Sequence, residues 1–147
     1  MFKHILVPTD GSELSNSTVA AAVQLAATLG AKITALYVME EYPVLPIAEF
    51  APVNTLSVDE FRDAQLEQSK KFLKQAEQLA AAANVTFDAA AVASLSIYRS
   101  IIDTAEQKGC DLILMASHGR RGLEGLLLGS ETHKVLTHSK IPVLVYR

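Results

Sequence analysis

A glycine-rich stretch holds the residues whose types and spacing point most clearly to chemistry. It runs from Ala116 to Ser130 and contains Gly119, Gly122, Gly125 and Gly129. Glycine lets backbone amides approach an anion without an intervening side chain, and it adopts positive φ where a loop must bend. The stretch therefore predicts a loop suited to phosphate.

Charged residues in the same stretch fit this interpretation. His118, Arg120 and Arg121 add local positive charge, and arginine grips phosphate oxygens in pairs. We expect Ser130 to be the N-cap of a following helix, whose free amides and positive dipole end would face the ligand. The alternative is a solvated loop whose charges bind nothing specific.

Two familiar phosphate motifs do not fit the sequence. A Walker loop needs Lys before its final Ser or Thr, whereas Leu128 and Gly129 precede Ser130. The dinucleotide fingerprint G-x-G-x-x-G would follow the first strand, where only Asp10-Gly11-Ser12 is found.

Residues for fast catalysis are scarce. There is no G-x-S-x-G elbow, and neighbouring side chains on a loop rarely meet, so a triad of Ser117, His118 and Asp10 is a minor alternative. Slow hydrolysis of a bound phosphate ligand would need only positioned phosphates and Mg²⁺. We expect a ligand-responsive binding protein rather than a fast enzyme, and assign no catalytic residue.

Composition narrows the class of protein. The 147 residues predict one domain over 1–147, and a net charge of −3 gives no reason to expect a nucleic-acid partner. Cys110 stands alone, and no leader-like or membrane-spanning apolar stretch is evident, so we expect a cytoplasmic protein without a membrane partner. His4, His133 and His138 lack zinc-ligand spacing, and Cys110 is expected to be a buried small residue.

Short apolar runs alternate with segments of helical spacing. The runs predict strands at 5–7, 33–38, 85–92, 112–115 and 143–146. Helices are expected between them, with Gly30 and Gly109 as C-caps and Ile141-Pro142 ending the last helix. This alternation is typical of a doubly wound α/β fold with a five-stranded parallel sheet and helices on both faces.

Right-handed crossovers give the sheet order 3-2-1-4-5. The order reverses between the first and fourth strands, and open α/β sheets bind ligands beyond the carboxyl ends of such strands. The loop after the first strand and the glycine-rich stretch should meet there. This placement favours phosphate binding over a solvated loop.

The segment from Glu40 to Ser57 is an exception to the short connections elsewhere, and it contains Pro43, Pro46 and Pro52. A loop of this length is usually functional or mobile. A flap over the ligand and a simple surface excursion are equally good interpretations.

The sequence resembles the universal stress protein family, specifically its ATP-binding branch. The resemblance covers Ile5–Ser12, Ala35–Val38, Asp111–Gly119, Gly129-Ser130 and Ile141–Val145. The family signature is Gly, two residues, Gly, nine residues, Gly, then Ser or Thr. Gly119, Gly129 and Ser130 match its latter part, and Ala116 stands where the signature has its first glycine.

The resemblance implies a fold of the adenine nucleotide alpha-hydrolase-like type, with ATP and possible Mg²⁺ in the crevice. Asp10 would hydrogen-bond the ribose or help hold Mg²⁺, although capping the turn into the first helix explains it equally well. The implied nucleotide-binding residues are Pro8, Thr9, Asp10, Val38, Met115, Ala116, His118, Gly119, Arg120, Gly129, Ser130, Glu131 and Thr132.

The last strand, Pro142 to Tyr146, is expected at a sheet edge, where an apolar strand is a template for pairing. Self-pairing across a two-fold axis would give a homodimer, as the resemblance also implies. A loop or the second helix covering this edge is the alternative. The leading hypothesis is an ATP-binding stress-response or signalling homodimer, and the alternatives are a regulatory dimer of the same fold without nucleotide, or a slow ATP hydrolase.

Overall fold

The computed structural model describes residues 1–41, 57–120 and 128–147. Strands and helices alternate along the chain, with bounds β1 His4–Pro8, α1 Glu13–Leu29, β2 Lys32–Glu40, α2 Val58–Ala82, β3 Phe87–Ser94, α3 Ile97–Gln107, β4 Leu112–Ala116, α4 Ser130–His138 and β5 Val143–Tyr146. One predicted strand begins too early: Val85 precedes β3, because its amide donates to the Ala80 carbonyl at the end of α2 (2.9 Å).

The sheet has the order β3-β2-β1-β4-β5 and every pairing is parallel. The predicted doubly wound topology is confirmed. β1 lies at the centre, where it pairs with β2 along its whole length and with β4 at Ile5 and Leu6. The reversal of strand order therefore lies between β1 and β4, as expected.

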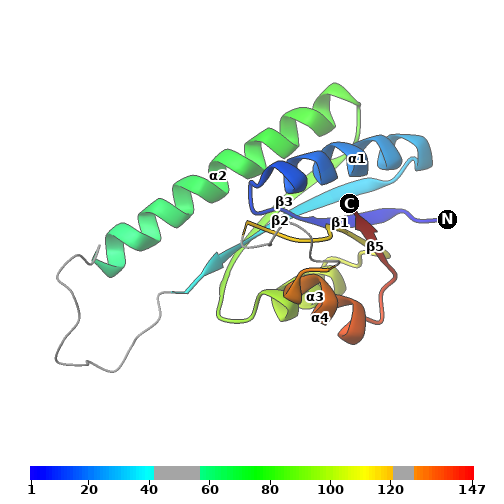
Figure 1. Cartoon of the computed structure of the whole chain (residues 1–147). Coiled ribbons are helices and arrows are strands. Elements are labelled where there is room, and N and C mark those ends of the chain that lie inside the picture. Colours follow the sequence, from blue (N-terminus) through cyan, green and yellow to red (C-terminus); the bar gives the residue numbers. More distant parts are fainter. Residues whose placement is uncertain (42–56, 121–127) are drawn as a thin grey trace.

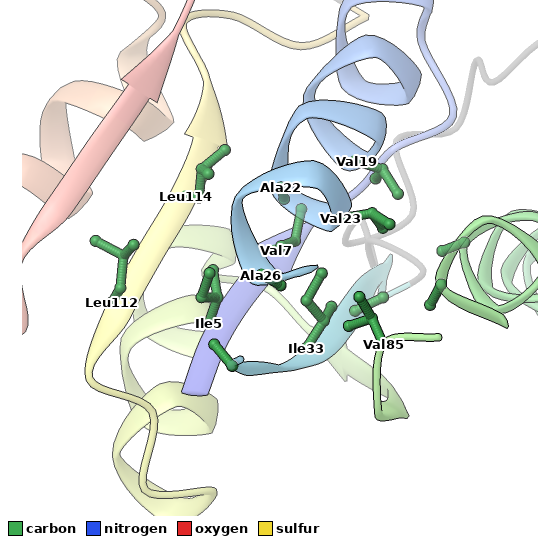
Figure 2. Close-up of a cluster of buried hydrophobic side chains, with 14 residues drawn as sticks. Ile5, Val7, Val19, Ala22, Val23, Ala26, Ile33, Val85, Leu112 and Leu114 are labelled. Carbon is green, nitrogen blue, oxygen red and sulfur yellow. The ribbon is translucent and has the colours of Figure 1, made fainter. Parts of the chain in front are cut away.

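Helices cover both faces of the sheet, with α1 and α2 on one side and α3 and α4 on the other (Figure 1). Figure 2 shows the first of two apolar clusters, in which Val19, Ala22 and Ala26 of α1 lie over Ile5 and other strand residues. The second cluster joins Leu6, Ile113 and Met115 to Ile101 of α3 and Val135 of α4. Alanines on α1 let the helix approach the sheet closely.

Glycines end two helices, as predicted. Gly30 is the C-cap of α1 with φ +63°, and its amide donates to the Ala26 carbonyl. Gly109 has φ +67° and follows Lys108, the C-cap of α3, so it lies one residue beyond its predicted position. Left-handed φ is accessible to glycine at little cost.

α2 is the longest helix of the described ranges, with 25 residues. A capping box fixes its start: the Ser57 hydroxyl accepts from the Glu60 amide (3.2 Å), and the Glu60 carboxylate accepts from the Ser57 amide (2.8 Å). The first turns of α2 lie beyond the carboxyl end of β2 (Figure 1). The hypothesis of a flap at 40–57 falls largely on residues 42–56, outside the described part of the chain.

Cys110 is buried, as expected, with 6% of its surface exposed. Burial raises the pKa of its thiol to about 11, so the thiolate is scarce at neutral pH. Within the described ranges, no helix has the length and apolar character needed to cross a bilayer.

His4 is buried at the amino end of β1. Its Nε2 lies 2.7 Å from Thr34 Oγ1, and desolvation lowers its pKa, with Lys32 adding to the effect. A lowered pKa means that the folded protein resists protonation which the unfolded chain accepts. The stability from neutral His4 is thus present above the unfolded pKa of about 6.5 and is lost as pH falls through the folded pKa.

We predict that His4→Gln flattens the decline in unfolding free energy below pH 6.5. One proton limits the slope removed to about 1.4 kcal/mol per pH unit. Urea titrations at pH 7.5, 6.5 and 5.5 measure it, with exposed His133→Gln as the matched control that keeps the parent slope. Identical slopes in all three proteins would contradict the assignment.

Candidate functional site

The loops after β1 and β4 meet over the carboxyl ends of these neighbouring strands, and Asp10 joins them. Its Oδ1 accepts from the Ser12 amide (2.9 Å) in its own loop. Its Oδ2 accepts from the Arg120 amide (2.8 Å), which lies 110 residues further along the chain. One carboxylate thus both orders the turn into α1 and fixes the start of the glycine-rich stretch.

This contact explains why residue 119 is glycine. A Cβ added there would lie 2.6 Å from Asp10 Oδ2, closer than any real contact allows. Because two amides hold the Asp10 carboxylate, it cannot simply turn aside. Gly119 is therefore required for the two loops to approach.

The predicted N-cap of α4 is wrong by one residue. Gly129 is the N-cap, with φ −69° and ψ 153°, and its carbonyl accepts from the His133 amide (2.9 Å). Ser130 is the first helical residue and is exposed, and no side chain caps the helix. Gly129 has the extended conformation of an N-cap, and this conformation allows its amide to donate to the Ser117 carbonyl.

Gly129 is held against the end of β4. Its amide donates to the Ser117 carbonyl at 2.7 Å, so this N–H is already used. A Cβ on Gly129 would lie 3.1 Å from both His118 Cα and the Ser117 oxygen. The amides of α4 without a helical partner are therefore those of Ser130, Glu131 and Thr132, which precede the first helical bond.

A cavity of about 630 Å³ opens at this point of the sheet. All the residues that the resemblance implies for nucleotide binding line it: Pro8, Thr9, Asp10, Val38, Met115, Ala116, His118, Gly119, Arg120, Gly129, Ser130, Glu131 and Thr132. The structure brings them together from both loops and from β1, β2, β4 and α4. Volume and mixed lining are typical of a small-molecule site.

Further lining residues were not singled out from the sequence. They are Ser15, Leu36, Glu40, Gln65, Gln68, Ile97, Ile101 and Leu128. Gln65 and Gln68 are one helical turn apart on α2, a spacing that would have indicated a shared polar face had the helix been extended to Ser57. Ile97 and Ile101 of α3 also belong to the second apolar cluster.

The lining divides into an apolar and a polar part. Leu36, Val38, Ile97, Ile101 and Met115 supply aliphatic and thioether surface, which suits a flat, weakly polar ring. Charge elsewhere in the lining comes from Asp10, Glu40, Glu131 and Arg120, with His118 beside them. The described charges are thus mainly acidic, and Arg121, Gly122 and Gly125 lie outside the described part of the chain.

Ala116 is a regular strand residue. Among residues 1–41, 57–120 and 128–147, Asn84 is the only non-glycine with positive φ, so alanine at 116 carries no backbone strain. Its carbonyl accepts from the buried Thr132 hydroxyl (2.9 Å). Thr132 therefore ties α4 to the end of β4, and its hydroxyl proton is committed to this bond.

Glu131 joins the two helices on its face of the sheet. Its Oε2 accepts from the Tyr98 amide in the first turn of α3 (2.9 Å), and its Oε1 accepts from Lys134 (2.8 Å). Ser96, the N-cap of α3, makes no side-chain capping bond, so a residue of α4 caps α3 from outside.

One expectation about side chains was wrong. Ser117 and His118 do meet: Ser117 Oγ lies 3.2 Å from His118 Nδ1. Ser117 is buried, however, and the Asp10 oxygens accept from the Ser12 and Arg120 amides. In the part of the chain described, no cluster of three His, Cys, Asp or Glu residues could hold a metal ion.

The sequence matches the universal stress protein family over residues 1–147. It is 34% identical over 149 residues to the universal stress protein YxiE of Bacillus subtilis, covering 100% of both chains. A universal stress protein of Methanocaldococcus jannaschii is 30% identical over 147 residues, covering 100% of this chain and 83% of the relative.

Solved structures share the same fold. The universal stress protein UspA from Lactobacillus plantarum superimposes with a TM-score of 0.84 at 27% identity, covering 99% of this chain and 98% of that one. A universal stress protein in complex with cAMP gives 0.73 at 24% identity, covering 99% and 97%. One from Archaeoglobus fulgidus in complex with dAMP gives 0.68 at 14%, covering 100% and 98%. The chain therefore belongs to the universal stress protein family.

Proposed function

We propose that residues 1–147 form a single nucleotide-binding domain that binds an adenine nucleotide such as ATP. We further propose a cytoplasmic homodimer that acts in stress response or signalling. The observation that carries the nucleotide proposal is the cavity between β1 and β4, which combines an apolar part with the first-turn amides of α4 that have no helical partner. Two proteins of the same fold have been solved with cAMP or dAMP, which shows that this fold accommodates adenine nucleotides.

The residues suggest how such a ligand would lie. The adenine ring fits the aliphatic surface of Val38, Met115 and Ile97, and the phosphates fit the amides of Ser130, Glu131 and Thr132 at the positive end of the α4 dipole. Arg120 has five N–H donors and would complete the phosphate site. The mainly acidic lining would favour a nucleotide that brings a divalent cation with it.

Asp10 would contact Mg²⁺ in this arrangement. Each carboxylate oxygen keeps a lone pair after accepting its amide, and Mg²⁺ is held in proteins by carboxylate and phosphate oxygens together. The ion would neutralise part of the negative charge of Asp10 and Glu131, which would otherwise repel the phosphates. We propose a binding role rather than fast catalysis, because the Asp10 carboxylate orders the two loops instead of completing a triad with His118.

A regulatory dimer that binds no nucleotide was the alternative suggested by Ala116. The ordinary strand conformation of Ala116 supports the binding hypothesis instead, since the methyl group costs no backbone energy there.

Ser130→Asp should separate ligand binding from folding. A carboxylate in the first turn favours the helix dipole by about 0.3–1 kcal/mol, so the free protein should melt at the same temperature or slightly higher. The same charge would repel phosphate and lower ATP affinity about tenfold or more. Calorimetric titration with ATP and Mg²⁺, together with thermal melts, measures both effects.

The matched control is Ser130→Asn, which has nearly the same shape and no charge. It should keep most of the ATP affinity and the ligand-induced rise in Tm, which corresponds to about 2.7 kcal/mol at a hundred times Kd. Absence of saturable heat in the parent at millimolar ATP would refute nucleotide binding. Equal affinity in the Asp and Asn variants would refute the phosphate position.

The homodimer proposal rests on β5. Ile113 donates to the Pro142 carbonyl and Ser117 donates to the Tyr146 carbonyl, so the even-numbered residues of β5 face β4. The amides and carbonyls of Val143 and Val145 therefore point to the open side, where a second β5 could pair.

Val145→Pro should break this pairing by removing an outward N–H. Light scattering after gel filtration should give twice the 15.8 kDa chain mass for the parent and one chain mass for the variant. Val145→Thr keeps the N–H and the branched shape and should remain a dimer, while cooperative melting of Val145→Pro shows that it still folds. A monomeric parent, or a dimeric proline variant, would contradict the interface.

A further inference from the structure

Tyr37 of β2 connects two residues that line the cavity, Gln68 and Arg120. The sequence alone did not single it out. Its side chain is 1% exposed, and its ring stacks on Phe72 of α2 with centroids 6.0 Å apart and planes at 24°. Burial and stacking leave the ring one orientation. The phenol oxygen is therefore a fixed point beside the cavity.

A directed chain of hydrogen bonds passes through this oxygen. The Tyr37 hydroxyl donates to Gln68 Oε1 at 3.2 Å, and Arg120 Nη2 donates to the Tyr37 oxygen at 3.1 Å. A phenol has a single proton, so donation to Gln68 leaves its lone pairs for the arginine. Gln68 thus sets the direction of the chain, and the chain ends at a guanidinium that lines the cavity.

Arg120 is consequently held at two points. Asp10 Oδ2 accepts from its backbone amide at 2.8 Å, and Tyr37 accepts from one terminal nitrogen of its side chain. No residue in the described ranges accepts from the other N–H donors of the Arg120 guanidinium, which would then serve an anion. Fixing a long side chain in advance removes conformational entropy that a ligand would otherwise have to overcome.

α2 also contacts the other loop. The ring of Phe72 lies where a Cβ on Gly11 would be, 2.1 Å from the nearest ring atom, and Gly11 has φ +77°. The same helix thus contacts the β1 loop through Phe72 and reaches the β4 loop through Gln68 and Tyr37. A displacement of α2 would disturb both loops together.

We propose that Tyr37 and Gln68 are positioning residues that orient Arg120 toward the phosphates of the bound nucleotide, an inference that rests on the proposed function. Phosphate affinity then depends on the position of α2. By linkage, a nucleotide with phosphates holds α2 in place, whereas a nucleoside does not.

Tyr37→Phe tests this proposal because it keeps the ring and removes only the hydroxyl. We expect ATP affinity to fall about tenfold to a hundredfold, the usual range for a hydrogen bond to a charged group, while adenosine affinity stays unchanged. Calorimetry with ATP and with adenosine gives both values. In an Arg120→Gln background, which itself lowers ATP affinity, the added Tyr37→Phe change should have no further effect.

Tyr98→Phe is the matched control. It also removes a hydroxyl that accepts from an arginine, Arg99 Nε at 3.1 Å, but neither residue lines the cavity, so ATP affinity should not change. Gln68→Leu, at an exposed position of α2, is a second variant that leaves the Tyr37 ring in place. We expect a smaller loss of ATP affinity and no loss of adenosine affinity.

Parallel losses for ATP and adenosine, or independent effects of Tyr37→Phe and Arg120→Gln, would overturn the inference by showing a merely structural role. So would an unchanged ATP affinity in Tyr37→Phe and Gln68→Leu when the parent binds ATP. A parent that binds neither ligand would instead refute the proposed function, and the inference with it.

Discussion

The approach of two loops across the β1–β4 boundary is the constraint on which the site depends, and the Asp10 carboxylate satisfies it. Without an acceptor there, the Arg120 amide and the turn before α1 would each need another partner. The absence of a side chain at Gly119 permits this contact, and the absence of one at Gly129 permits the next, between α4 and the end of β4. Each glycine is explained by protein packing before any ligand is considered.

The cavity is thus a product of the sheet topology. Strands that diverge at β1 and β4 leave space between α1 and α2 on one face and α3 and α4 on the other. Aliphatic residues of β2, β4 and α3 line this space because they continue the second apolar cluster. The polar part comes from helix-start amides and loop residues, together with Glu40 of β2 and Gln65 and Gln68 of α2.

Topology and the convergence of the two loops could be predicted from the sequence, because apolar runs, helical spacing and crossover handedness each carry local signals. The N-terminal half of α2 could not, since its residues are mostly exposed and lack an apolar stripe, and its start depends on the Ser57–Glu60 capping box. The contacts of Arg120 with Tyr37 and Tyr37 with Gln68 join residues distant in sequence, so no spacing rule indicates them. Gly129, and not Ser130, is the N-cap of α4, and the Gly129 amide donates to the Ser117 carbonyl. This backbone bond exists only in the folded loop, so the sequence did not indicate it.

Ala116 takes part in three features of the fold. It lines the cavity, pairs with Tyr146 of β5, and its carbonyl accepts a hydrogen bond from the Thr132 hydroxyl of α4. The pocket wall and the outermost strand are consequently separated by the width of a single strand. Thr132 ties α4 to the carbonyl of Ala116, the last residue of β4 that pairs with β5. The proposed nucleotide site and the proposed β5 interface therefore share one residue, without a long relay through the molecule.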